Sequence, residues 1–232
     1  MKFDLFIYLC ELNLKMKAII IYSGGLDSTV LLYQYKKNIG LAVSFDYGSK
    51  HNDREIRCAK KNCRKLGIPH LIIPLPFFSH FKSSLLKDGG QIPEGNYADE
   101  NMKSTVVPFR NGIMLSIAAG IAESHEMDTL LIANHGGDHS IYPDCRTEFI
   151  HAIDEAVRLG TYANVRIVSP YAEMNKRNIA LIGKELNIDF SETYSCYNGN
   201  EVHCGVCSTC IERKEALSGF DATNYKTLKN IF

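Results

Sequence analysis

The stretch Ser23-Gly24-Gly25-Leu26-Asp27-Ser28 is the most informative about the architecture of the chain, because it joins two segments of different character. Residues 17–22 before it are apolar and rich in isoleucine, which predicts a strand buried on both faces. Residues 27–37 after it have the pattern of a helix. The two glycines let the chain turn sharply, and the free N–H groups of a helix start attract an anion. The sequence therefore predicts a phosphate-binding loop between a strand and a helix.

This loop differs from two widespread nucleotide motifs. It lacks the Gly-Lys-Ser/Thr of a Walker A loop and the Gly-x-Gly-x-x-Gly of a dinucleotide fold. A tight strand–helix turn without a ligand is the alternative, but six ordered positions in this setting favour a ligand. Ser23 and Ser28 supply hydroxyl donors, and Asp27 is placed to hold a divalent cation or to fix the turn.

The rest of the chain alternates between apolar runs and helical patterns. Short apolar runs predict further strands at residues 41–45, 70–75, 128–133 and 165–168. Helices are predicted at residues 52–66, 110–123, 147–159 and 175–186. Gly67 stands where a helix C-terminal glycine is usual, and Asn175 where an N-cap is usual. This alternation predicts an α/β fold with a doubly wound, mostly parallel sheet covered on both faces.

Composition and charge favour a small-molecule substrate. The chain has 232 residues, and its 26 Lys and Arg balance its 26 Asp and Glu. Proteins that live on nucleic-acid phosphate usually carry a basic excess, so we expect no stable nucleic-acid partner, with a local basic patch left open. We find no secretory signal and no run of about 18 apolar residues that a membrane span needs. We therefore expect a cytoplasmic protein without a membrane partner.

Two polar segments besides the phosphate loop follow predicted strands, at residues 45–51 and 134–146. Ligands of open parallel sheets bind at the carboxyl ends of the strands, so both segments are expected at the site. Asp138 is a candidate Mg²⁺ ligand beside phosphates. His135 and His139 are interpreted as hydrogen-bonding residues rather than as a second metal site.

Three residues of the later segment suit recognition of a substrate. Asp144 can accept hydrogen bonds from a guanine-like edge, and Arg146 can grip a carboxylate with two bonds. Tyr142 lies beside them. The alternative is that Tyr142-Pro143-Asp144 forms a turn that caps the next helix.

Two basic residues stand at predicted helix starts. They are Arg110, within Val107-Pro108-Phe109-Arg110-Asn111, and Lys176. A positive charge there opposes the helix dipole, so each position is a candidate for ligand contact. With Asp27 and Asp138 they form the set of candidate catalytic residues.

Residues 77–105 form a long polar connection with several glycines. Connections of this length are usually functional or disordered. A loop that closes over a substrate and a plain surface insertion are both open interpretations.

Four cysteines lie close together near the end of the chain, Cys204-x-x-Cys207-x-x-Cys210 and, upstream, Cys196. Four thiolates in a short polar segment are typical of a closed structural zinc site, and the metal would fold a segment without its own core. Unligated cysteines and an iron–sulfur cluster are the alternatives. The ferredoxin spacing is not matched, because residues 211–214 hold no cysteine. We therefore predict Zn²⁺ bound by a small C-terminal segment.

The motifs together resemble a known family. The phosphate loop is similar to that of pyrophosphate-loop ATPases, which activate carboxylates with ATP. It is followed in order by Phe45-Asp46-Tyr47-Gly48, Val107-Pro108-x-Arg110-Asn111, Tyr142-Pro143-Asp144-Cys145-Arg146-x-Glu148-Phe149 and the four-cysteine tail. This set resembles the 7-cyano-7-deazaguanine synthase (QueC) family over about residues 17–220.

The resemblance implies a fold and an activity. The fold is Rossmann-like, of the adenine nucleotide alpha hydrolase type, with an ATP-binding domain at residues 17–190 and a zinc-binding segment at residues 191–232. Residues 1–16 are then an N-terminal extension. The family uses ATP, Mg²⁺ and ammonia to convert 7-carboxy-7-deazaguanine to 7-cyano-7-deazaguanine, a queuosine precursor. Its members are commonly homodimers.

The resemblance also implies which residues bind each ligand. The zinc ligands correspond to Cys196, Cys204, Cys207 and Cys210. The substrate residues are expected to be Arg110, Tyr142, Asp144 and Arg146. The residues expected to bind ATP are Tyr22, Ser23, Gly24, Gly25, Leu26, Asp27, Ser28, Thr29, Val30, Leu31, Leu32, Phe45 and Asp46.

The chain departs from the family pattern in three expected site loops. Phe109 replaces a usual glycine, Ser49-Lys50-His51 replaces Gln-Arg-His, and Asn134-His135 replaces a usual Thr-Gly start. These changes motivate an alternative, a paralogue that stops at the amide or joins the acid to another amine, which includes an amine on a protein. Two further alternatives are a transfer-RNA thiolase-type enzyme and a non-catalytic nucleotide-binding module.

Overall fold

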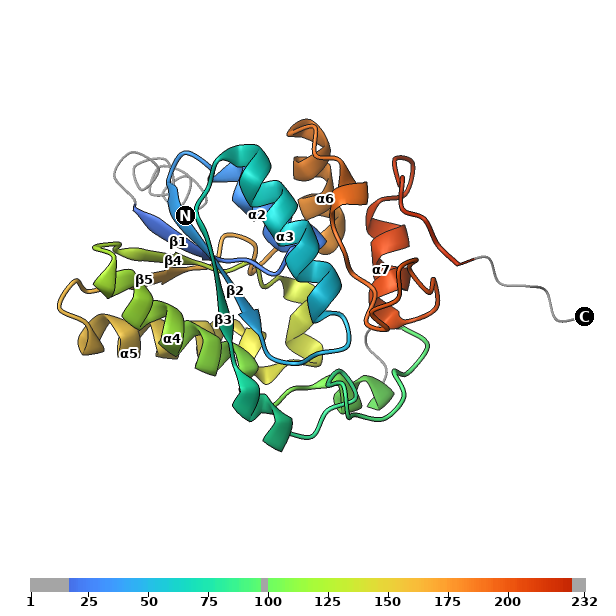
Figure 1. Cartoon of the computed structure of the whole chain (residues 1–232), viewed down its shortest axis with the longest axis horizontal. Coiled ribbons are helices and arrows are strands. Elements are labelled where there is room, and N and C mark those ends of the chain that lie inside the picture. Colours follow the sequence, from blue (N-terminus) through green and yellow to red (C-terminus); the bar gives the residue numbers. More distant parts are fainter. Residues whose placement is uncertain (1–16, 97–99, 227–232) are drawn as a thin grey trace, which may run out of the picture.

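The computed structural model of the chain describes residues 17–96 and 100–226 (Figure 1). The predicted extension at residues 1–16 lies outside the described residues. Within the described residues, strands and helices alternate along the chain as the sequence predicts.

A five-stranded parallel sheet forms the centre of the molecule. Its strands are β1 (Ala18–Ile21), β2 (Ile39–Asp46), β3 (His70–Pro74), β4 (Thr129–Leu131) and β5 (Arg166–Val168), in the order β3-β2-β1-β4-β5. In the register of the sheet, Ile20 lies opposite Ala42 on one side and Leu131 on the other. The predicted parallel α/β fold is confirmed. The strand order reverses at β1, which opens a crevice at the carboxyl ends of β1 and its neighbours.

Helices cover both faces of this sheet. They are α2 (Leu26–Gln34), α3 (Asn52–Leu66), α4 (Arg110–Ser124), α5 (Thr147–Gly160), α6 (Lys176–Glu185) and α7 (Ser208–Ala216). Figure 1 shows α2, α3 and α6 on one side and α4 and α5 on the other. Each side has its own apolar cluster, so the sheet is doubly wound. Short 3₁₀ helices lie at Pro76–His80, Glu100–Thr105, Gly136–Ser140, Pro143–Cys145 and Phe190–Glu192.

Two predicted helix ends have the expected geometry. Gly67 follows α3 in a left-handed conformation, with φ of 68°, which a glycine adopts without steric cost. The side chain of Asn175 accepts a hydrogen bond from the Asn178 backbone at the start of α6. Local signals of this kind need no information from the rest of the fold.

The segment Met102–Ser124, which contains α4, is long and apolar enough to cross a membrane, with a mean hydropathy of 1.3. The sequence expectation that no stretch meets this test was therefore wrong. Half of its apolar window is buried inside the fold, and Met114, Leu115 and Ala118 pack in the core beneath the sheet. This is the composition of a buried helix in a core.

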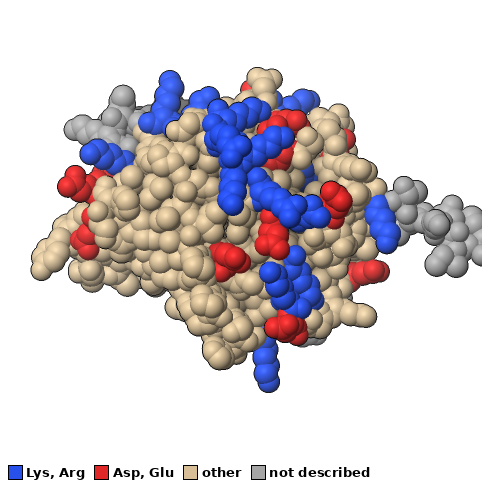
Figure 2. Space-filling model, viewed as in Figure 1, with Lys and Arg blue, Asp and Glu red and all other residues tan. Residues whose placement is uncertain are grey.

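Basic side chains gather on the outward face of α3, as Figure 2 shows. Arg57, Lys60, Lys61, Arg64 and Lys65 are exposed there. Lys61 and Lys65 both pair with Glu192, at 3.1 and 3.2 Å. A local basic surface thus exists on a chain of zero net charge, and carboxylates partly neutralise it.

The long connection after β3 is ordered along most of its length. Lys50 anchors it, because its ammonium group donates hydrogen bonds to the carbonyls of Ser84, Gly89 and Gly90. Further along, Glu94 forms a bridge with Cys207, so the connection also reaches the cysteine segment. It borders a second cavity of about 960 Å³ beside β3.

Gly24 is a position where the fold leaves no room for a side chain. Its φ is +93°, and a Cβ there would collide with the Glu55 carbonyl oxygen and lie 2.8 Å from the Ala59 nitrogen of α3. We expect Gly24→Ala to lower the free energy of unfolding by about 3 kcal/mol or more, since strained backbone and overpacking add. Urea unfolding measures this. Gly120→Ala, on an exposed face of α4 with open space around it, is the control and is expected to raise stability by up to about 1 kcal/mol. An equal, small effect of both substitutions would contradict the prediction.

Candidate active site

A cavity of about 230 Å³ lies at the carboxyl ends of β1, β2 and β4, where the strand order reverses. Its walls come from segments far apart in the sequence: the phosphate loop, the start of α3, the start of α4, residues 132–138, Lys176 and residues 194–197. Four predicted catalytic residues meet in it, namely Asp27, Arg110, Asp138 and Lys176.

The phosphate loop has an internal hydrogen-bond network that holds its shape. The Gly25 N–H donates to Ser23 Oγ at 3.0 Å, and the Ser23 and Ser28 hydroxyls lie 3.0 Å apart. Gly25 is the N-cap of α2, so the next backbone N–H groups lie in the first helical turn, where they have no partner within the helix. These donors at the positive end of α2 suit the oxygens of a phosphate.

Lys176 links the phosphate loop to the cysteine segment. Its ammonium group lies 3.2 Å from an Asp27 oxygen and 2.7 Å from a Glu212 oxygen, and its side chain is 11% exposed. Burial alone lowers the pKa of Lys176, but the carboxylates of Asp27, Glu212 and Asp138 raise it well above the ordinary value. Lys176 is therefore a fixed cation in the cavity.

His135 is fully buried beside the same carboxylates. Its Nδ1 accepts a hydrogen bond from the Gly137 N–H at 3.1 Å, which assigns the proton of the neutral ring to Nε2. Among residues 17–96 and 100–226, Nε2 has no hydrogen-bond partner, and it lies within 4.0 Å of Asp27, Asp138 and Glu212. The bond at Nδ1 agrees with the expectation of a hydrogen-bonding histidine. The N–H at Nε2 can donate to a ligand oxygen that binds beside these three carboxylates.

The group of side chains around Lys176 contains more carboxylates than cations. Asp27, Asp138 and Glu212 face the ammonium of Lys176. Phosphate added to such a group would be repelled unless a cation accompanied it. The donor set, carboxylate oxygens next to a phosphate-binding loop, fits the predicted Mg²⁺.

Arg110 forms the opposite wall of the cavity. Its guanidinium donates a hydrogen bond to the Tyr47 hydroxyl at 3.3 Å and lies 5.8 Å from the centre of that ring. Burial lowers the pKa of Arg110, but nearby Tyr47 and Asp144 raise it well above the ordinary value, so the charge persists. No carboxylate in the described part of the chain forms a bidentate pair with this buried cation, so it is suited to a substrate carboxylate.

Tyr142, Asp144 and Arg146 do not line this cavity. The Asp144 carboxylate accepts a hydrogen bond from the Asn111 N–H at 2.8 Å, so it caps the start of α4. Arg146 donates to the His139 carbonyl, and Tyr142 bonds to the hydroxyls of Thr105 and Tyr197. In this structure the three residues hold the loops around Arg110. The alternative interpretation of a turn that caps the next helix is wrong in its partner, because Asp144 caps α4 and the start of α5 has no side-chain cap.

Some of the residues expected to bind ATP line the cavity, and the others do not. Those that line the cavity are Tyr22, Ser23, Gly25, Leu26, Asp27, Ser28 and Phe45. Gly24 does not line the cavity. Val30, Leu31 and Leu32 are buried in the core on the α2 face of the sheet, and Thr29 bonds to the Tyr22 hydroxyl and the Gly25 carbonyl. Asp46 lines the second cavity instead.

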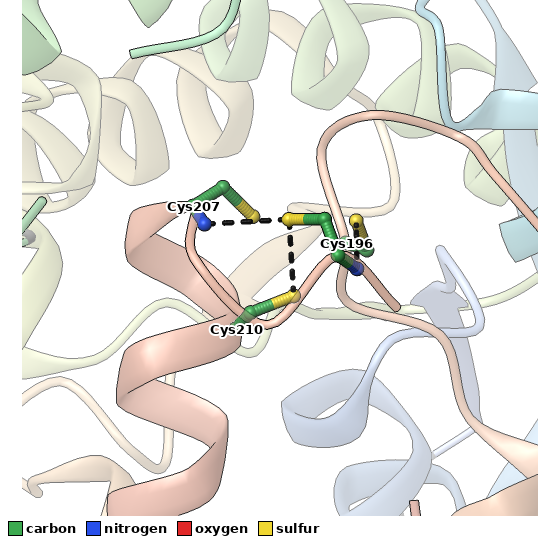
Figure 3. A group of neighbouring side chains, drawn as sticks. Cys196, Cys207 and Cys210 are labelled. Carbon is green, nitrogen blue, oxygen red and sulfur yellow. Dashed lines mark hydrogen bonds between the residues drawn. The ribbon is translucent and has the colours of Figure 1, made fainter. Parts of the chain in front are cut away.

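The four predicted zinc ligands meet at the start of α7. The sulfur atoms of Cys196, Cys204, Cys207 and Cys210 lie within 4.8 Å of one another and are buried. Figure 3 shows Cys207 and Cys210 at the beginning of α7, and their sulfur atoms point toward the loop that carries Cys196. A tetrahedral zinc with bonds of about 2.3 Å needs sulfurs about 3.8 Å apart, so four thiols at this spacing fit the ion.

Arg213 attaches this cysteine cluster to the rest of the molecule. It is fully buried, and its guanidinium donates to Thr193, Ser195, Thr223 and the Phe190 carbonyl. The end of α7 also contributes to the core shared with α2 and α6. The cysteine segment is thus packed against the phosphate-binding half of the molecule.

Comparison with known proteins places the chain in a family. A family model described as "Queuosine biosynthesis protein QueC" matches residues 17–221.

The chain belongs to the QueC family.

Several relatives are named 7-cyano-7-deazaguanine synthase. The one from Porphyromonas gingivalis strain W83 is 57% identical over 90% of this chain and 97% of its own length. That from Desulfotalea psychrophila is 56% identical, over 90% of this chain and 98% of its own length. The one from Rhizobium johnstonii is 46% identical, over 91% and 92% respectively. These QueC relatives match the chain over nearly all of their sequence.

Two solved structures share the fold at low sequence identity. A U34-tRNA thiolase from Methanococcus maripaludis, solved with its [4Fe-4S] cluster, has a TM-score of 0.51 and 16% identity, covering 78% of this chain and 61% of its own. The NMN synthetase of Francisella tularensis has a TM-score of 0.50 and 13% identity, covering 91% and 82%. These likenesses support the Rossmann-like architecture and nothing finer.

The departures from the QueC pattern have structural explanations. Phe109 adopts a left-handed conformation with φ of 53°, which a glycine would adopt more easily. Its ring is 59% exposed, covers Gly112 and meets Phe149, so it points away from the cavity. Lys50 donates hydrogen bonds to the connection after β3. His135 lies beside the carboxylates of Asp27, Asp138 and Glu212. Phe109 thus does not line the cavity.

Two carboxylates were missed by the sequence interpretation: Glu55, which lines the cavity, and Glu212, which bonds to the cavity residue Lys176. Glu212 lies two residues after the last cysteine, and nothing in its local pattern indicates a contact with Lys176. Glu55 had a weak signal, because it precedes Ala59 and Cys63 on the buried face of α3, where a carboxylate is unusual. A charged residue on the apolar face of a QueC helix is therefore worth testing.

Proposed function

We propose that this QueC-family chain is an ATP-dependent carbon–nitrogen ligase that converts 7-carboxy-7-deazaguanine and ammonia to 7-cyano-7-deazaguanine. The observation that carries the proposal is the 57% identity to a named synthase over 97% of that protein's length. The cavity supports it independently, because the predicted phosphate loop and a buried guanidinium line the same cavity.

The reaction needs a poor electrophile to be activated. ATP supplies a good leaving group for the carboxylate oxygen. The loop N–H groups, Ser23, Ser28 and Lys176 are the groups that would hold its phosphates, with Mg²⁺ at the carboxylates of Asp27 and Asp138. The positive charge of Arg110 orients the substrate carboxylate toward them. Because reactants held in line gain a large effective concentration, no enzyme nucleophile is required.

The remaining elements of the proposal follow from the same assignment. Zn²⁺ at the four cysteines has a structural role, since all four positions of a tetrahedral ion are filled by thiolates. A cytoplasmic homodimer without a stable nucleic-acid partner remains our expectation from composition and family.

Product analysis tests the proposed activity. Full-length protein is mixed with 7-carboxy-7-deazaguanine, ATP, Mg²⁺ and ammonium, and the products are identified by mass spectrometry. We expect the nitrile, with consumption of ATP that depends on the acid. An amide as the final product, or acid-dependent ATP consumption without a nitrile, would instead support the diverged paralogue.

A further inference from the structure

Three oxygen atoms converge beside Gly25 of the phosphate loop. A Cβ at this glycine would lie 3.2 Å from Ser23 Oγ, 3.4 Å from Glu55 Oε1 and 3.4 Å from the Tyr194 carbonyl oxygen. The backbone angles of Gly25, φ −74° and ψ 173°, are open to any residue. The lack of a side chain at Gly25 therefore leaves the space between these three oxygens open on the cavity side of the loop.

The chemistry of these three atoms selects a small cation with N–H donors. A carboxylate and a carbonyl oxygen accept hydrogen bonds only. The Ser28 hydroxyl donates to the Gly25 carbonyl, so the Ser23 hydroxyl can donate to Ser28, accept from the Gly25 N–H and keep one lone pair for a further donor. Within residues 17–96 and 100–226, the Glu55 carboxylate has no hydrogen-bond partner. Its nearest ionisable neighbour, His51 Nε2, lies 3.7 Å away, and the carboxylate side chain is 16% exposed, toward the cavity.

We propose that Glu55, Ser23 Oγ and the Tyr194 carbonyl form the binding site for ammonium, and that Glu55 is the base that converts it to ammonia. This inference rests on the proposed function, which requires a nitrogen donor. The site adjoins the phosphate loop, and the activated carboxyl group is joined to a phosphate through a single oxygen. A nitrogen held beside Gly25 is therefore close to the carbon that it must attack.

The proposed step balances in protons and electrons. Glu55 accepts one proton from ammonium, and the lone pair released on nitrogen forms the new C–N bond. The C–O bond to the phosphate breaks as this bond forms, and the nucleotide leaves with that electron pair. The second proton lost from nitrogen passes to solvent, which leaves the neutral amide.

The surroundings of Glu55 suit this role. Burial raises the pKa of Glu55 to about 8, and the Arg110 guanidinium on α4 opposes that rise. On α3 itself, burial lowers the pKa of His51 to about 3 and raises that of Cys58 to about 11, so both are neutral. The phosphate loop and residue 194 face Glu55 with a hydroxyl and a carbonyl. A base whose pKa lies near the working pH transfers protons efficiently.

The test separates activation of the acid from use of ammonium. Acid-dependent pyrophosphate exchange measures the first, and product formation against ammonium concentration measures the second. For Glu55→Gln we expect exchange within about threefold of the unsubstituted protein and a fall of about 100-fold in kcat/KM for ammonium. Glu55→Asp should recover part of the loss. Asp53→Asn, the same chemical change at an exposed site of α3, should leave both unchanged.

Two further readouts distinguish a base from a structural residue. Hydroxylamine is largely unprotonated at neutral pH, so its reaction with the activated acid should survive in Glu55→Gln. The ammonium-dependent rate of the unsubstituted protein should rise as pH passes through about 8, because the carboxyl group then loses its proton. In Glu55→Gln this rise should shift to higher pH, where free ammonia itself becomes abundant.

The outcomes that overturn the inference differ from failure of the proposed function. If the unsubstituted protein forms neither amide nor nitrile, the proposed function is wrong. If it forms them and Glu55→Gln has the same ammonium dependence, the ammonium site is wrong. A folded Glu55→Gln that loses pyrophosphate exchange and the hydroxylamine reaction together would also overturn it, since Glu55 would then serve activation.

Discussion

Replacing Cys207 with serine is expected to remove the bound metal and to unfold the segment from residue 194 to the end of α7. Cys207 is fully buried, and its sulfur belongs to the four-thiol group. A hydroxyl is a weak ligand for Zn²⁺, and binding of a structural zinc is worth about 10–16 kcal/mol in small zinc domains. We expect metal content to fall from about one ion per chain to near zero, and the melting temperature to drop.

Loss of the metal should also disturb the residues around Lys176 in the cavity. Glu212 stands two residues after Cys210 and bonds to Lys176, and Arg213 holds the loop that contains Ser195. Disorder in α7 therefore removes one carboxylate from the Lys176 cluster and loosens one wall of the cavity. Acid-dependent ATP consumption should fall together with metal content.

Elemental analysis and thermal melting, before and after dialysis against a chelator, measure both effects. Cys58→Ser is the matched control, because Cys58 is a half-buried thiol outside the four-cysteine group. It should keep the metal and its melting curve. Unchanged metal content in Cys207→Ser would show that the ion is not held by these cysteines, and iron with a broad visible absorption would show that it is not zinc.

Lys176→Met is expected to lower turnover by about 10³-fold. The methionine keeps most of the apolar stem but removes the cation that lies between Asp27 and Glu212. Charge that develops on the leaving phosphate then loses a fixed positive partner, and losing one such donor typically costs 10²–10³-fold or more. Steady-state measurement of acid-dependent ATP consumption gives the effect on kcat.

A second variant separates catalysis from stability. Lys176→Met alone leaves two facing carboxylates without their cation and should lower the melting temperature as well. The double variant Lys176→Met with Glu212→Gln removes one of these charges, so it should recover stability and remain inactive. Lys184→Met, near the exposed end of the same helix, is the control and should behave like the unsubstituted protein. Recovery of activity in the double variant would contradict a direct role for Lys176.

Local patterns were sufficient for the framework of the fold. The isoleucine run of β1, the left-handed Gly67 and the Asn175 cap each depend on a few neighbouring residues, and all three predictions are confirmed. α7 was missed for the same reason. Its nine residues carry few apolar positions, and it is held by Arg213 and the cysteines rather than by an amphipathic pattern.

The site was predicted where its residues belong to a motif and missed where they do not. Asp27 and the phosphate loop are recognisable because the glycines, the strand and the helix are contiguous in sequence. Asp144 is recognisable too, but its carboxylate caps α4, and that partner is known only once α4 is placed. A carboxylate has the same local appearance whether it binds a ligand, caps a helix or faces solvent.

The α/β class, the strand–loop–helix unit at residues 17–34 and the family could be predicted from the sequence alone, because each depends on residue order over short spans. The contacts of Glu212 with Lys176 and of Glu55 with the space beside Gly25 could be found only in the folded chain, since these partners are 36 and 30 residues apart. Such contacts depend on how α3, α6 and α7 pack around one crevice. Packing of this kind is set by the whole core, which no short segment encodes.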